Sequence, residues 1–268
     1  MLLWYHGKNT IGRVIEYGKE TYFMLWGLQH LGYIPGRGGR YPEDVRWTGR
    51  LQALLGPDYT VIEEGQSGRT TVWDDPVENR LAGITYLWPC MESQSPFDLL
   101  IIMLGTNDTK SYFGVKSRPI AMSAGRLVGL AQKSRFGIDG QPPEVLLVSP
   151  IEIWESEVFH ASIDAENVAK AKDFPKYFRE AADLYGCHFF DAAAVAQPSA
   201  VDGIHMEPEA HAALAEALAA QIHSILGCSL LTFFGGVGRF FQKGPPRRAA
   251  LRGRLHVRLR AQGIFQLF

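Results

Sequence analysis

One run of apolar residues, Leu99 to Leu104, constrains the fold of this chain more than any other feature. Such a run without polar alternation is typical of a strand buried on both faces, as in the middle of a parallel sheet. It stops at Gly105, and Thr106-Asn107-Asp108 comes next. Open α/β folds bind ligands at the carboxyl ends of their strands, and an Asn amide placed there can stabilise an oxyanion. A simple turn after a core strand explains the motif equally well.

Strand-like and helix-like segments alternate along most of the chain. The expected strands cover Thr21–Trp26, Tyr59–Ile62, Leu99–Leu104, Glu144–Ser149 and His188–Asp191, and the expected helices cover Asp44–Leu55, Ala121–Ala131, Ala165–Tyr185 and Glu207–Leu226. Pro175 predicts a kink or a split in the third helix. Residues 63–71 are expected to form a polar loop, and Val72–Pro96 has no clear period and is expected to be irregular. The alternation predicts an α/β fold with a doubly wound, mainly parallel sheet.

Composition narrows the class of protein. A chain of 268 residues with 46% hydrophobic and 21% charged residues can form one large globular domain or two small ones. The formal net charge of -1 gives no reason to expect a nucleic-acid or membrane partner. Cys90, Cys187 and Cys228 lack metal-ligand spacing, and no export signal is visible. We therefore expect a cytoplasmic protein with reduced thiols.

A second group of reactive side chains precedes the last expected helix. Asp202 stands three residues before His205, and Gly203 between them lets the chain turn. The carboxylate can then orient the imidazole and stabilise its charged form, while the other ring nitrogen acts as a general base. Taken alone, the pair is more simply explained by the frequency of Asp and His in loops and helix caps.

Together with Glu64–Thr71, which reads Glu-Gly-Gln-Ser-Gly-Arg-Thr-Thr, these two motifs resemble the SGNH or GDSL-type hydrolases. The resemblance runs from about Gly32 to Leu226, and the order and spacing of the motifs are specific together although each is weak alone. Asp-Val-Arg-Trp at Asp44–Trp47 is similar to the arylesterase and acyltransferase branch of that family.

The resemblance implies a three-layer α/β/α sandwich with a flavodoxin-like, five-stranded sheet. It also implies hydrolysis of a small-molecule ester, or acyl transfer, by a Ser-His-Asp triad that His205 and Asp202 complete. Gly68 and Asn107 are the family's oxyanion-hole positions. No metal and no organic cofactor is expected, and the branch tends to form homo-oligomers.

The nucleophile is where the chain departs from this pattern. The family places a Gly-Asp-Ser motif after its first strand, but this chain has Leu28 at the serine position. Ser67 is a poor substitute, because the family uses backbone N–H groups in that segment. Codons for Lys19–Gly32 can be chosen so that the neighbouring reading frame spells Lys-Lys-Arg-Ile-Leu-Cys-Phe-Gly-Asp-Ser-Asn-Thr-Trp-Gly. We interpret the departure as a frameshift in the gene or in its sequencing rather than as a natural pseudoenzyme.

The two ends of the chain fit the same interpretation. We expect residues 1–20 to be an N-terminal extension foreign to the family, 21–226 to be the hydrolase-like domain, and 227–268 to be a basic, poorly ordered C-terminal extension. This last segment contains Arg and Lys but no Asp or Glu. A basic arm for nucleic acid or anionic lipid is the alternative to a non-native tail, and we favour the tail.

Two other classes of function remain open at this point. A catalytically inactive protein that binds acyl ligands would keep the pocket and lose turnover, and Leu28 favours it. A nucleotide-binding α/β module would need a phosphate-binding loop after its first strand. The chain has neither Gly-x-Gly-x-x-Gly nor Gly-x4-Gly-Lys-Ser/Thr, which argues against that class.

Overall fold

The computed structural model describes residues 20–26, 32–157 and 164–237, and it describes side chains within 32–157 and 164–227. The chain divides into two compact units, Met1–Gly227 and Cys228–Phe268. Leu28, residues 1–19 of the expected N-terminal extension, and residues 238–268 of the expected C-terminal extension lie outside the described residues. The three-part division of the chain therefore stays a prediction.

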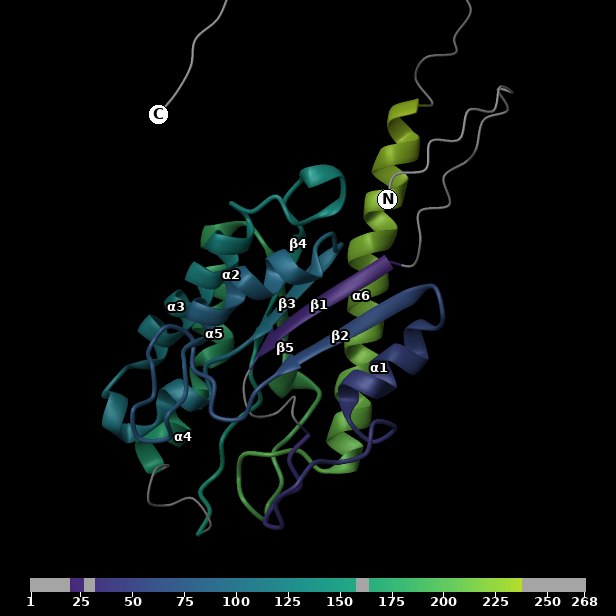
Figure 1. The fold of residues 1–268 in the computed structure, drawn as a ribbon. Coiled ribbons are helices and arrows are strands. Elements are labelled where there is room, and N and C mark those ends of the chain that lie inside the picture. Colours follow the sequence, from purple (N-terminus) through teal and green to yellow (C-terminus); the bar gives the residue numbers. More distant parts are fainter. Residues whose placement is uncertain (1–19, 27–31, 158–163, 238–268) are drawn as a thin grey trace, which may run out of the picture. The chain divides into compact units, whose positions relative to one another are not determined.

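The first unit contains a five-stranded sheet with the strand order β2-β1-β3-β4-β5 (Figure 1). The strands are β1 (Glu20–Trp26), β2 (Tyr59–Gly65), β3 (Leu99–Met103), β4 (Glu144–Ser149) and β5 (His188–Asp191). All neighbouring strands are parallel. Every residue of β3 is buried, because β3 lies in the middle of the sheet with helices on both faces. The predicted doubly wound α/β fold is confirmed.

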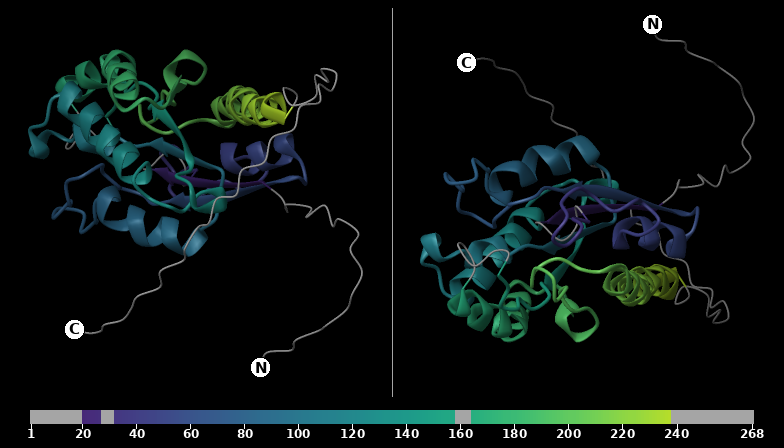
Figure 2. Two further views of the ribbon diagram at one scale, coloured as in Figure 1. Left: turned by 90° about the horizontal axis from the view of Figure 1, so that it is seen from above. Right: turned by 90° about the horizontal axis from the view of Figure 1, so that it is seen from below.

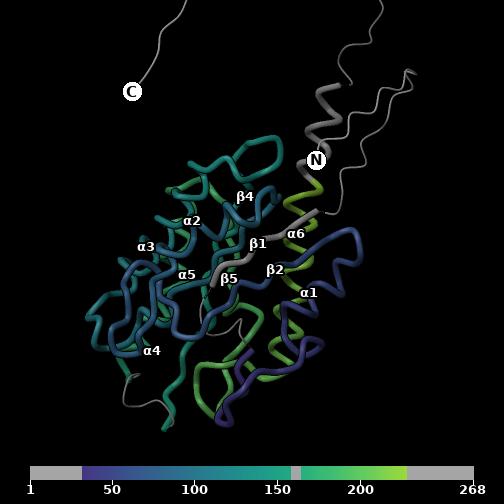
Figure 3. The backbone as a smooth tube through the Cα atoms, in the orientation of Figure 1, coloured from purple at the N-terminus to yellow at the C-terminus, as the bar shows by residue number. Residues whose placement is uncertain are grey.

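Helices cover both faces of the sheet (Figure 2). The helix α1 (Trp47–Leu55) and the first part of α6 (Pro208–Val237) lie on one face, and α2 (Gly83–Gln94), α3 (Ser117–Ala131) and α5 (Phe174–Tyr185) lie on the other. The short helix α4 (Ala165–Lys172) precedes α5. A tube through the backbone shows the same path without the ribbons (Figure 3). Each fully buried Leu or Phe side chain at these contacts contributes about 1.5 to 3 kcal/mol relative to exposure.

Most segments form where the sequence predicts them, with β4 and β5 matching at both ends. The segment 165–185 splits at Asp173 as predicted, and Pro175 lies in the first turn of α5, where its missing N–H costs no helical hydrogen bond. The helix α1 begins three residues later than predicted, α3 begins four residues earlier, and α6 extends beyond Leu226.

Two predictions for the segment 63–96 were wrong. Residues 63–65 continue β2 instead of opening a loop. The helix α2 forms in the stretch that was expected to be irregular, with Pro89 inside it. Its buried residues, Gly83, Leu87, Cys90 and Met91, do have a helical spacing. The proline and the neighbouring exposed Trp88 obscured that period in the sequence.

The strand β1 occupies the place that the sequence predicts for it, despite the missing motif at its end. Its backbone pairs in parallel with β2 from Glu20↔Tyr59 to Trp26↔Gly65, and with β3 from Tyr22↔Leu99 to Trp26↔Met103. An apolar, β-compatible sequence is therefore sufficient for this position in the sheet.

Candidate active site

Three polar segments lie at the carboxyl edge of the sheet (Figure 1). Residues 66–71 come after β2, the 3₁₀ turn η2 (Asn107–Thr109) comes after β3, and the loop with Asp202 and His205 connects β5 to α6. Because all five strands are parallel, their carboxyl ends share one edge. Asn107 and His205 therefore lie at the same edge, as the sequence predicts, and Gly68 lies there as well.

Asp202 and His205 form a buried, hydrogen-bonded pair. The distance from Asp202 Oδ2 to His205 Nδ1 is 2.7 Å, and both side chains are at most 2% exposed. The other carboxylate oxygen accepts the backbone N–H groups of Ile204 and His205 at 3.1 and 2.9 Å. Burial alone would raise the pKa of Asp202, but the hydrogen bonds and charge of His205 outweigh it and hold this pKa below its ordinary value. The ionised carboxylate thus orients the imidazole, and Nε2 is the nitrogen placed for general-base chemistry.

The backbone of this loop is fixed by contacts with neighbouring segments. Gly203 has φ +72°, and a Cβ there would lie 2.1 Å from the carbonyl oxygen of Trp154. The Trp154 N–H donates to the Gly203 carbonyl at 2.8 Å, and the Ser199 N–H donates to the His205 carbonyl at 2.6 Å. Glycine at position 203 is therefore a steric requirement for the loop.

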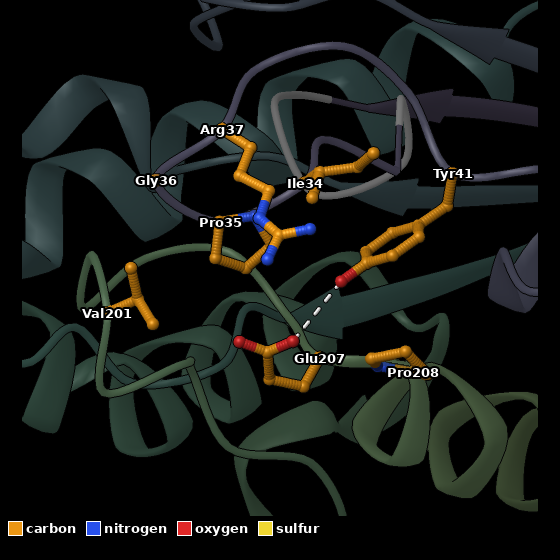
Figure 4. A pocket seen from close by; sticks show the side chains of 8 residues that line it. All are labelled: Ile34, Pro35, Gly36, Arg37, Tyr41, Val201, Glu207 and Pro208. Carbon is orange, nitrogen blue, oxygen red and sulfur yellow. Dashed lines mark hydrogen bonds between the residues drawn. The ribbon is translucent and has the colours of Figure 1, made fainter.

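Residues that the sequence did not single out surround the same loop. The ring of Tyr33 packs on the His205 ring with centroids 4.3 Å apart. Glu207 accepts the hydroxyls of Ser199 and Tyr41 at 2.6 and 3.2 Å, so it ties the loop after β5 to the segment after β1 (Figure 4). No local pattern marks these contacts, because the partners are far apart in the sequence.

A cavity of about 440 Å³ adjoins this contact (Figure 4). Its walls are mostly apolar, and the polar groups of Arg37, Tyr41 and Glu207 reach into it. Such a mixed lining is typical of sites for small molecules. The lining residues are Ile34, Pro35, Gly36, Arg37, Tyr41, Val201, Glu207 and Pro208.

Gly68 and Asn107 lie in segments that contact each other. Gly68 has φ +77°, and a Cβ there would meet the Glu78 carboxylate at 2.7 Å. The Asn107 side chain is buried, and its Nδ2 donates to the carbonyl of Arg69 at 3.1 Å. One Nδ2–H is used in this bond, so the second can serve a ligand. Arg69 itself donates to the Glu64 carbonyl at 2.6 Å, which stabilises the segment between them.

A cluster of charged side chains lies next to Gly68, and the sequence analysis did not predict it. Lys110 Nζ lies 3.0 Å from Asp75 and 2.5 Å from Glu78, and the Tyr112 hydroxyl donates to Asp75 at 2.6 Å. Burial would raise the pKa of Asp75, but these hydrogen bonds and the lysine charge hold it below its ordinary value. The cluster joins the segment after β2 to the segment after β3 and keeps the wall behind Gly68 in place.

Asp108 is the one carboxyl group among these three segments whose pKa is shifted upward. Its side chain is completely buried, and Oδ1 accepts both the backbone N–H and the hydroxyl of Thr71, at 2.8 and 2.5 Å. Burial raises the pKa of Asp108 to about 6, although the Thr71 bonds partly oppose the shift. No titration of this group could be anticipated from the sequence, because the shift comes from burial.

The two cysteines with described side chains cannot replace a serine nucleophile. Burial raises the pKa of Cys90 to about 12 and that of Cys187 to about 11. Neither thiol ionises appreciably near neutral pH, and the thiolate is the reactive form.

Metal-ligand clusters and membrane-spanning helices are both absent from the described part of the chain. Within 32–157 and 164–227, no group of three or more His, Cys, Asp or Glu side chains is arranged to hold a metal ion. None of the helices among the described residues is both long and apolar enough to cross a membrane.

The family model of the GDSL-like Lipase/Acylhydrolase family matches residues 32–213. Among solved structures, a carbohydrate acetylesterase from Sinorhizobium meliloti is 36% identical, with 77% of this chain and 100% of that chain covered and a TM-score of 0.74. The aryl esterase of M. smegmatis is also 36% identical, with coverages of 76% and 99% and a TM-score of 0.73. A second carbohydrate acetylesterase family member from Sinorhizobium meliloti is 31% identical, with coverages of 78% and 99% and a TM-score of 0.74. No curated protein matches the chain.

Proposed function

Because the chain belongs to the GDSL-like lipase/acylhydrolase family, we propose that its domain is the scaffold of a serine esterase for small-molecule esters, and that this chain lacks the nucleophile. The family membership agrees with the resemblance seen in the sequence, and the structural relatives are esterases. The buried Asp202–His205 pair at the carboxyl edge carries the proposal. A surface Asp–His contact would be explained as a loop or a cap, but a pair with this burial and orientation fits general-base catalysis.

In the proposed mechanism, a serine at the position of Leu28 attacks the acyl carbonyl. His205 accepts the serine proton through Nε2 and returns it to the leaving alkoxide, and Asp202 stabilises the imidazolium through Nδ1. The Gly68 N–H and the Asn107 amide donate hydrogen bonds to the oxyanion of the tetrahedral intermediate. Water then releases the acyl group, or another alcohol accepts it. This chemistry needs neither metal nor organic cofactor.

Leu28 has no nucleophilic atom, so we propose a frameshift upstream of Gly32. The family match begins at residue 32, the point where the alternative reading frame would rejoin the present one. The structural relatives are nevertheless covered over their full length. The strand β1 therefore lies outside the family match, although its backbone forms part of the sheet.

Restoring the motif tests the proposed function. Met24–Leu31 is replaced by Cys-Phe-Gly-Asp-Ser-Asn-Thr-Trp, and hydrolysis of p-nitrophenyl acetate is measured with and without His205→Ala. We expect the unmodified chain to hydrolyse the ester no faster than its His205→Ala variant. The restored chain should gain at least about 10³-fold in kcat/KM, since a serine nucleophile is the largest missing part of the triad. Strong His205-dependent activity in the unmodified chain, or none in the restored chain, would contradict the proposal.

Leu28 also favours a second candidate, a protein that binds acyl ligands without turnover. An amide analogue of the ester, N-phenylacetamide, distinguishes the two. A binding protein should show a concentration-dependent rise in Tm with this analogue, because a ligand that binds only the folded state stabilises it. Binding by the unmodified chain together with an inactive restored chain would favour this candidate.

The expected cytoplasmic location and the homo-oligomer stay predictions. The first depends on the cysteine pattern, and the second depends on the branch of the family that Asp44–Trp47 resembles. The mass of the native particle in solution tests the second directly.

A further inference from the structure

The turn η2 holds the segment 68–71 at two positions. The Asn107 amide donates to the carbonyl of Arg69, and the Asp108 carboxylate accepts two hydrogen bonds from Thr71. The two contacts have opposite hydrogen-bond directions. Asn107 donates to the segment at Arg69, whereas Asp108 accepts from the segment at Thr71. A pair of this kind fixes both the position and the orientation of the segment.

Asp108 makes these bonds at an energetic cost. Its Oδ2 is buried and has no hydrogen-bond partner among the described residues. A buried carboxylate oxygen without a partner is unfavourable, and such a group in a folded protein requires an explanation. Water at the surface cannot satisfy this oxygen, because the Asp108 side chain is not exposed to solvent.

The other side of the same segment is fixed by α2. The backbone N–H groups of Gly83 and Ile84 donate to the carbonyls of Thr70 and Thr71 at 2.9 and 3.0 Å. The peptide units after Gly68 are thus held between the start of α2 and the turn that carries Asn107. Gly68 directly precedes these residues and has a left-handed conformation.

We propose that Asp108 is a positioning residue of the oxyanion hole, which fixes Thr71 so that the Gly68 N–H and the Asn107 amide keep their relative placement. This inference rests on the proposed esterase function, because the oxyanion gives the two donors a common target. Asp108 itself touches no substrate. Oxyanion donors stabilise the transition state because they are already in place when the negative charge develops. A residue that fixes both donors should therefore raise kcat rather than tighten substrate binding.

Amide hydrogen exchange tests whether Asp108 fixes the backbone at Thr71. It is measured on the full, unmodified chain and does not require enzymatic activity. Asp108→Ala should raise the exchange of the Thr71 amide by at least about tenfold, because this N–H loses its acceptor, Asp108 Oδ1. Asp108→Asn keeps an acceptor oxygen and should restore slow exchange to within about threefold. Thr71→Val, which keeps the N–H and loses only the hydroxyl, should give an intermediate result.

Gln132→Ala serves as the matched control. It removes the hydrogen bond from Gln132 to the Tyr185 carbonyl, 2.8 Å long, where α3 and α5 end near the opposite edge of the sheet. Its exchange effect should be confined to that region. Unchanged exchange of the Thr71 amide in Asp108→Ala, or an equal rise of Thr71 exchange in Gln132→Ala, would overturn the proposed role of Asp108.

Kinetics of the chain with the restored serine then tests the role in catalysis. Asp108→Ala should lower kcat by about 10- to 100-fold with KM changed less than about threefold, somewhat below the loss for removing a donor outright. Asp108→Asn should recover most of kcat, and Gln132→Ala should leave kcat unchanged. A rise in KM at constant kcat, or an unchanged kcat, would overturn the inference while leaving the esterase intact. A restored chain without turnover would instead reject the esterase function, and with it the oxyanion role, whatever the exchange shows.

Discussion

The strands β1 and β3 are neighbours in the sheet, but the segments at their carboxyl ends differ in kind. β3 leads into Asn107 and Asp108, whose side chains hold the segment after β2. β1 leads into Gly27–Leu31, which contains no Gly-Asp-Ser motif. Both strands nevertheless pair in an uninterrupted parallel register from Tyr22↔Leu99 to Trp26↔Met103.

The difference shows that strand placement and chemistry have separate sequence requirements. A place in the sheet needs a short apolar segment with β propensity, and many sequences meet that need. Catalysis needs particular atoms in the first residues beyond the strand, and one wrong side chain removes them. The proposed frameshift would therefore preserve the fold and remove the nucleophile.

The largest effect is expected for Asp202, and it tests whether the contribution of Asp202 to catalysis requires a serine after β1. In the chain with the restored serine, Asp202→Asn should lower kcat by about 10³- to 10⁴-fold, because the imidazole loses its orientation and its counter-charge. In the unmodified chain the same substitution should change nothing measurable in p-nitrophenyl acetate hydrolysis. Initial rates of the four proteins give the comparison. Equal losses in both backgrounds would mean that Asp202 and His205 act without the restored serine.

A second substitution tests the catalytic role of the segment that follows β3. Asn107→Ala in the restored chain should lower kcat by about 10²- to 10³-fold with little change in KM, as expected for the loss of an oxyanion donor. Steady-state kinetics separates the two parameters. If KM rises instead, Asn107 contributes to ground-state binding and the oxyanion assignment is wrong.

The sequence predicted the features that depend on local pattern. The sequence located Glu144–Ser149 as a buried strand and His188–Asp191 as a short strand, and the spacing of Asp202 and His205 predicted their contact. It missed Tyr33 and Glu207, because contacts between residues that are distant in the chain leave no local period. Pro89 concealed α2, since a proline within a helix removes an N–H donor and usually ends the helix.

The third prediction compares Asp108 at the end of β3 with other buried titratable groups. The folded pKa of Asp108, about 6, exceeds its unfolded value, so the folded state binds more protons between about pH 4 and 6. Its contribution therefore lowers the free energy of unfolding by up to about 3 kcal/mol as pH rises through that window. Burial and the nearby arginines lower the pKa of His211 to about 4, which acts with the opposite sign over the same range.

Asp108→Asn removes only the first contribution, so the free energy of unfolding should then rise more steeply between pH 4 and 6 than in the unmodified chain. Urea melts at half-unit pH steps measure the difference. Asp202 has a lowered pKa, and its stabilisation is lost only as the pH falls below its unfolded value, outside this window. Parallel pH profiles of the two proteins would show that Asp108 does not titrate near pH 6.

The smallest expected effect concerns the stability of β1 itself. The restored chain has Cys, Phe and Gly in place of Met24, Leu25 and Trp26, so the largest change is a glycine instead of Trp26, the residue opposite Met103 in the backbone register. Overpacking of this kind costs about 1 to 3 kcal/mol, a large share of the usual net stability of about 5 to 15 kcal/mol. Urea melts of the unmodified and restored chains should therefore show a lower midpoint for the unmodified chain at equal slope. An equal or higher midpoint with unchanged slope would mean that β1 tolerates the larger side chains without strain, and the two strands would then differ only in the chemistry at their carboxyl ends.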